Sequence, residues 1–91
     1  MFDLVKLVGQ VRARSDAGTA TLIGRFQGAA FGYALAVTCD MHLAEDATQD
    51  AFVEAMRCID QLDDPAAFPG WLRGIVRHCS HRALRRRQAA A

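Results

Sequence analysis

The chain has 91 residues with a formal net charge of +1, and 52% of its residues are hydrophobic. This length is enough for one domain with a modest core. No apolar run approaches the roughly 20 residues of a membrane-spanning helix, and Lys6 interrupts the first apolar stretch, which argues against a secretory signal. We therefore expect a single domain, residues 1–91, that is cytoplasmic and has no membrane partner.

The charges are divided unevenly between the two parts of the chain. Residues 1–64 contain five Lys or Arg and ten acids, a net charge of −5, whereas residues 65–91 contain six Arg and no acid, a net charge of +6. Such an asymmetry indicates two partners of opposite charge, and arginine suits phosphate recognition. The three cysteines lack a CxxC pair and are expected to be reduced, buried thiols: Cys39, Cys58 and Cys79.

Apolar spacing predicts two helices before residue 40. The first covers residues 2–12, and the second covers residues 17–39, with Ser15 or Asp16 as its N-cap. The second has a broad apolar face, with further apolar residues outside it, so we expect it to be central to a bundle. Three glycines at i,i+4 spacing on one edge indicate close packing of a neighbouring helix: Gly24, Gly28 and Gly32.

A short connection, residues 40–43, precedes a third predicted helix over residues 44–62. Its core face comprises Thr48, Ala51, Phe52, Ala55, Met56, Ile59 and Leu62. The opposite face comprises Asp46, Gln49, Asp50, Val53, Arg57 and Asp60. Asp46 and Asp50 are like charges one turn apart, which costs a few tenths of a kcal/mol. The face is either a solvated surface with acids near the positive end of the helix dipole or a surface for a positively charged partner.

A loop, residues 60–68, contains the Asp64–Pro65 break and leads into a last helix over residues 69–87. The core positions of this helix are Leu72, Ile75, Val76, Cys79 and Ala83. The outer positions are Arg73, Arg77, Ser80, His81 and Arg87, flanked by His78, Arg82, Arg85 and Arg86. Strand-like alternation does not occur. The predicted fold is all-α, a compact bundle of three to four helices.

Two stretches together resemble a known family. A-E-D-A-T-Q-D-A-F at residues 44–52 is followed by F-P-G-W-L at 68–72, I-V-R at 75–77 and L-R-R-R at 84–87. These motifs resemble region 2 of bacterial sigma factors, with the greatest similarity to the extracytoplasmic-function (ECF) group. The resemblance covers residues 17–88. It divides the domain into a short N-terminal helix within residues 1–14, a core at 15–88 and a tail at 89–91.

The resemblance implies a transcription-initiation module that binds the clamp helices of core RNA polymerase and the non-template strand of the promoter minus-ten element. The polymerase-binding residues would be Asp46, Gln49, Asp50, Val53 and Arg57. The DNA-binding residues would be Asp63, Asp64, Phe68, Trp71, Arg73, Arg77, His78, His81, Arg82 and Arg85. An anti-sigma factor is a further expected partner. His78 and Arg82 depart from the Asn and Asp frequent in the family, and we expect the family's second domain, which reads the minus-thirty-five element, to be absent.

Other interpretations of these residues remain open. The last arginines would also suit the negative end of a helix dipole, and Trp71 would serve either the core or an unpaired base. The cysteines and histidines do not converge as zinc ligands do, and the chain has neither a nucleophile motif nor a phosphate loop. We therefore expect no metal, no cofactor and no enzymatic activity. A sigma-like decoy that binds an anti-sigma factor is the alternative function; a small helical dimerisation domain would not explain the charge asymmetry.

Overall fold

The computed structural model describes residues 2–90, and over this range the chain forms four α-helices and no strand. These helices are α1 (Leu4–Arg12), α2 (Asp16–Thr38), α3 (Met41–Arg57) and α4 (Phe68–Ala90). Two short 3-10 turns, η1 (Ile59–Gln61) and η2 (Pro65–Ala67), lie between α3 and α4. The predicted all-α fold is confirmed. Residue 1 of the predicted N-terminal segment and residue 91 of the predicted tail lie outside the described range.

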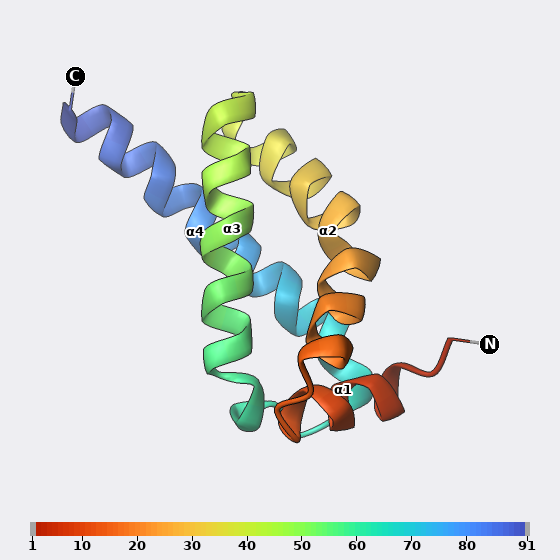
Figure 1. Ribbon diagram of the computed structural model, residues 1–91. Coiled ribbons are helices and arrows are strands. Elements are labelled where there is room, and N and C mark those ends of the chain that lie inside the picture. Colours follow the sequence, from red (N-terminus) through yellow and green to blue (C-terminus); the bar gives the residue numbers. More distant parts are fainter. Residues whose placement is uncertain (1, 91) are drawn as a thin grey trace.

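The helices pack around α2, as the sequence predicted for the second helix. Figure 1 shows α2 and α3 side by side, with α4 crossing behind them, and α2 contacts each of the other three helices. α1 lies at the end of the bundle where α2 begins and α3 ends. The C-terminal end of α4 projects beyond α3 in this view, and residues 85–90 are exposed.

Side-chain caps set the first residues of the helices. The Ser15 hydroxyl accepts a hydrogen bond from the Gly18 N–H at 3.0 Å, which confirms Ser15 as the N-cap of α2. The Asp40 carboxylate accepts one from the Leu43 N–H at 3.0 Å and caps α3. The predicted connection at residues 40–43 is therefore wrong, because α3 already begins at Met41.

The third helix also ends earlier than predicted. α3 stops at Arg57, and the chain continues through η1 to Leu62, whose backbone is extended at φ −76° and ψ 111°. The Leu62 carbonyl accepts a hydrogen bond from the Arg12 guanidinium at the end of α1. Ile59 and Leu62 still reach the core, as predicted, although the backbone between them is no longer α-helical.

Two parts of the core differ in the size of their side chains. The first part, which we call the aromatic cluster, consists of Phe26, Phe68 and Trp71. The Phe68 ring is fully buried and lies 5.2 Å from the Phe26 ring and 5.9 Å from the Trp71 ring, centroid to centroid. The second part, the alanine face of α3, comprises four alanines that are each 0% exposed: Ala44, Ala47, Ala51 and Ala55.

Two predictions about burial need correction, whereas Met56 is half-buried and packs against the core, on the face predicted for it. Ser80, which was predicted on the outer side of the last helix, is buried, and its hydroxyl donates a hydrogen bond to the Val76 carbonyl at 2.7 Å, which satisfies the buried group. All three cysteines are free, but only Cys79 is buried; Cys58 is half-buried and Cys39 is exposed.

The glycine edge of α2 does not contact a neighbouring helix. Gly24, Gly28 and Gly32 are exposed, and a Cβ atom added to any of them would meet nothing within 4 Å. The predicted close packing at this edge is therefore wrong for the described residues. Close packing occurs instead at Gly18, where an added Cβ would lie 2.9 Å from the Gln10 Cβ of α1.

Candidate functional site

One side of α3 presents the five residues predicted to bind polymerase. We call this side the outer face of α3; it consists of Asp46, Gln49, Asp50, Val53 and Arg57, and all five are exposed. The outer face lies opposite the alanine face, which fixes the helix against α2 and α4. The shared face that helical periodicity predicted is therefore observed.

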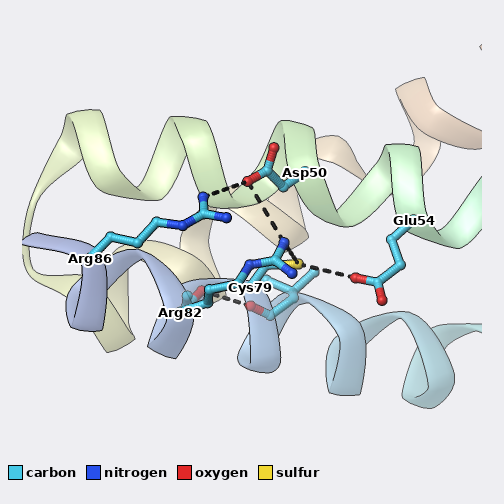
Figure 2. Close-up of polar contacts among 7 residues, drawn as sticks. Asp50, Glu54, Cys79, Arg82 and Arg86 are labelled. Carbon is cyan, nitrogen blue, oxygen red and sulfur yellow. Dashed lines mark hydrogen bonds and ion pairs between the residues drawn. The ribbon is translucent and has the colours of Figure 1, made fainter.

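Asp50 has positively charged neighbours from α4. Its Oδ2 lies 3.8 Å from the Arg82 Nη2 and 3.9 Å from the Arg86 Nη1, and Figure 2 shows both guanidinium groups directed toward this carboxylate. The sequence indicated like charges at Asp46 and Asp50, one turn apart on the helix. Among the described residues, the packing of α3 against α4 brings two arginines to Asp50 and none to Asp46.

A buried thiol lies next to this group (Figure 2). The Cys79 Sγ donates a hydrogen bond to the Glu54 Oε2 at 3.5 Å and accepts one from the Arg82 Nη2 at 3.6 Å. Burial, and then the hydrogen bond to Glu54, raise the pKa of the Cys79 thiol to about 11. With this pKa the thiol stays protonated at neutral pH. Because the reactive form of cysteine is the thiolate, Cys79 serves the contact between α3 and α4 rather than a reaction.

Glu54 and Arg86 belong to this group, although the sequence analysis assigned neither to a site. Their spacing contained a signal: Glu54 follows Asp50 by four residues, and Arg86 follows Arg82 by four residues. Each pair therefore occupies one side of its helix. Two helices that carry opposite charges at the same spacing can face each other. In the structure the acidic side of α3 faces the basic side of α4. The four charged side chains border a groove that also includes Val53 and Arg57.

The connection between α3 and α4 is anchored to the end of α1. The Asp60 carboxylate pairs with the Arg14 guanidinium at 2.8 Å, and both side chains are exposed. Asp64 caps η2 by accepting a hydrogen bond from the Ala66 N–H at 3.0 Å. Asp63 is exposed. Two predicted DNA-binding residues lie here: Asp63 is exposed, and Asp64 maintains the shape of the turn beside it.

The two aromatic residues assigned to DNA differ in their burial. Phe68 is 0% exposed and packs between Phe26 and Trp71, so it cannot touch DNA in this fold. Its assignment as a DNA-binding residue is wrong, because the residue completes the core where α4 begins. Trp71 is half-buried against the same core, and part of its ring remains accessible.

The polar residues of α4 fall into exposed and half-buried positions. The exposed ones are Arg73, Arg77, His78, His81 and Arg85, whereas Arg82 is half-buried beside Cys79. Arg73 borders an apolar groove of about 350 Å³ between α2 and α4. The groove is lined by Phe26, Ala29, Ala30, Tyr33, Pro69, Gly70, Leu72, Arg73 and Val76.

A third ion pair of α4 connects it to the residue before α3. The Arg87 Nη1 lies 2.8 Å from the Asp40 Oδ2. The hydrogen bond from the Leu43 N–H, with a smaller contribution from Arg87, holds the pKa of the Asp40 carboxyl below its usual value of 3.8. Asp40 thus both caps α3 and contacts the C-terminal part of α4.

Neither a metal cluster nor a membrane span is found within residues 2–90. Over this range no three His, Cys, Asp or Glu side chains are grouped so as to hold a metal ion. None of the described helices combines the length and the apolar character that crossing a membrane requires.

Comparison with known proteins identifies a relative of this chain. A protein of Xanthomonas campestris pv. campestris, described as "Probable RNA polymerase sigma factor RfaY", is 44% identical over 52 residues. The matched segment is 57% of this chain and 13% of the relative, so the chain corresponds to a small part of that protein. No solved structure matches the chain.

The family comparison covers most of the described fold. The family described as "Sigma-70 region 2" matches residues 22–90 of this chain. This segment includes most of α2 and the whole of α3 and α4. The match therefore contains the outer face of α3, the exposed cations of α4 and the polar contacts between the two helices. The chain belongs to the Sigma-70 region 2 family.

Proposed function

We propose that this chain is the region 2 domain of a sigma factor of the ECF group, and that it binds core RNA polymerase and the promoter minus-ten element in the cytoplasm. The observation that supports this best is the family match over residues 22–90, which includes two helices with different exposed charges. The domain would act by binding alone, through its two charged surfaces.

The outer face of α3 is the proposed docking surface for the clamp helices of the polymerase. Asp46 and Gln49 are exposed, and Asp46 makes no ion pair within residues 2–90. Val53, at 58% exposure, adds an apolar contact in the middle of the face. An acidic surface of this kind fits a basic partner, because complementary charges favour encounter and fix orientation.

The exposed cations of α4 are the proposed DNA surface. Arg73, Arg77 and Arg85 are exposed and make no ion pair with any described residue, so they are available to phosphates. Neutralising phosphates releases counterions from the nucleic acid and favours binding. His78 and His81 lie among them, and the exposed Asp63 with the accessible part of Trp71 would flank an unpaired base of the non-template strand.

A pull-down with core RNA polymerase tests this proposal. The chain should be retained by the polymerase, and single-stranded minus-ten DNA of the non-template sequence should be retained only when both proteins are present. A scrambled oligonucleotide of equal length is the control. Failure of the chain to bind the polymerase at low salt would overturn the proposed function.

One observation favours a second candidate, a sigma-like decoy that binds an anti-sigma factor. Phe68 is buried, and three arginines of α4 pair with acids, so fewer groups are available to DNA than the motifs imply. The same pull-down separates the two functions. A decoy would not increase DNA retention on the polymerase, whereas a promoter-binding domain would.

A further inference from the structure

The arginines of α4 form two groups. Arg73, Arg77 and Arg85 make no ion pair with any residue in the range 2–90. Arg82, Arg86 and Arg87 each lie within 4 Å of a carboxylate on or next to α3, at 3.8, 3.9 and 2.8 Å respectively. The second group therefore lies at the boundary between the proposed polymerase surface and the proposed DNA surface.

Asp50 belongs to both surfaces. It is on the outer face of α3 together with Asp46, yet a single oxygen of its carboxylate is nearest to both Arg82 and Arg86 (Figure 2). Arg82 is also held by its hydrogen bond to Cys79, and its side chain is 33% exposed. Arg86 has no second partner among the described residues, and its side chain is 68% exposed. Arg86 is therefore the arginine that Asp50 can release most easily.

We propose that Asp50 is shared between α4 and the cationic partner of the outer face, so that binding of the partner releases Arg86, and in part Arg82, to nucleic acid. This inference rests on the proposed function for the identity of the partner, a basic surface of RNA polymerase. In the free domain Asp50 weakens the binding of nucleic acid. In the complex the partner's cation replaces the arginines.

The distances make this exchange energetically feasible. Exposed ion pairs contribute little to stability, and pairs near 4 Å with exposed side chains are easily broken. A docked partner desolvates Asp50 and supplies its own charge, which strengthens the new pair relative to the old one. Coupling between two binding sites is reciprocal, so bound nucleic acid must also strengthen binding of the partner by the same factor.

The first test uses the free chain and a matched pair of variants. Asp50→Asn and Asp46→Asn remove the same charge from the same helix face, but only Asp50 contacts α4. Binding of fluorescein-labelled oligothymidylate is measured by anisotropy between about 20 and 200 mM salt. Release of one or two arginines should steepen the log–log salt slope of Asp50→Asn by about 0.7 to 1.4, and should raise its affinity at low salt at least about threefold above that of Asp46→Asn.

This test examines the restraint of the arginines by Asp50 without reference to polymerase. Equal slopes and affinities for the two variants would overturn it, because the arginines would then not be restrained by Asp50. Absence of oligothymidylate binding by Asp50→Asn at the lowest salt would also overturn it. A difference between the variants, in a chain that does not bind polymerase, would support the restraint of the arginines by Asp50 while overturning both the proposed function and the release by polymerase.

The second test adds core RNA polymerase and compares Arg86→Gln with Arg85→Gln. Arg85 makes no ion pair within the described chain, so Arg85→Gln should weaken DNA binding by the same factor with and without polymerase. Arg86→Gln should change the binding of the free chain less than twofold, and that of the complex at least about threefold. The same factor for Arg86→Gln in both states would contradict release by the partner.

Discussion

The aromatic cluster and the alanine face stabilise the same core with side chains of opposite size. At the aromatic cluster, large rings fill the space between α2 and the beginning of α4. At the alanine face, small side chains allow helices to approach closely, and polar side chains at the edge of the α3–α4 contact can then reach each other. The comparison indicates that one part of the core provides bulk, whereas the other part brings the two functional helices together.

The largest effect is expected from emptying the aromatic cluster. Phe68→Ala would remove a fully buried ring and should lower the free energy of unfolding by about 3–5 kcal/mol, a large part of the stability of a small domain. Urea denaturation followed by circular dichroism measures this change. Val5→Ala, at a position that is 53% exposed, is the control and should change stability by less than about 0.5 kcal/mol. Equal effects of the two changes would mean that Phe68 does not anchor the core.

The alanine face should be sensitive to enlargement instead. Ala51 is 0% exposed, so Ala51→Leu would insert a larger side chain into filled space. Overpacking of this kind typically costs about 1–3 kcal/mol of stability. The matched change Ala36→Leu, at an exposed position of α2, should be nearly neutral. Urea denaturation again measures both. A neutral Ala51→Leu would show that the two helices have free space between them.

The glycines of α2 provide a smaller effect of the opposite sign. Gly28→Ala should raise the free energy of unfolding by about 0.8–1 kcal/mol, because alanine favours the helix and its Cβ meets nothing within 4 Å. Gly18→Ala should lower stability, since its Cβ would lie 2.9 Å from that of Gln10. If Gly28→Ala destabilised the protein, the glycine edge would have a neighbour in solution.

The smallest effect concerns the charge of Asp40. The folded pKa is lowered, so the charged carboxylate stabilises the fold above its ordinary pKa of 3.8, and this stabilisation is lost as the pH falls through the folded pKa. Asp40→Asn retains an N-cap acceptor but cannot pair with Arg87. The melting temperature of the variant should be below that of the wild type at pH 7, and the difference should disappear as the pH falls below 3.8. A difference that is constant with pH would exclude the charge as its cause.

Helical periodicity predicted the elements and most of the core, because each helix buries one regular face. It could not predict the neighbours of Asp50, since these depend on the packing of α4 against α3 rather than on local sequence. The burial of Phe68 was not predicted, for a different reason. The F-P-G-W-L motif at residues 68–72 resembles region 2 of sigma factors, and this resemblance implied that Phe68 contacts DNA. The earlier start of α3 could have been found, because Asp40 is a good N-cap before a helical segment.

The outer face of α3 is the central element of the proposed function, and a single charge reversal tests it most directly. Asp46→Lys removes an exposed acid that no described residue pairs with, and Glu45→Lys makes the same charge change at a neighbouring exposed position outside the outer face. Loss of a buried partner charge typically costs about 2–5 kcal/mol, and 1.4 kcal/mol is a factor of ten in affinity.

The measurement is the affinity for core RNA polymerase, with thermal melting of the same preparations as the control for folding. We predict that Asp46→Lys weakens binding at least about tenfold, that Glu45→Lys weakens it much less, and that both variants melt within a few degrees of the wild type. Wild-type affinity in a well-folded Asp46→Lys variant, or equal losses in both variants, would contradict docking through the outer face of α3.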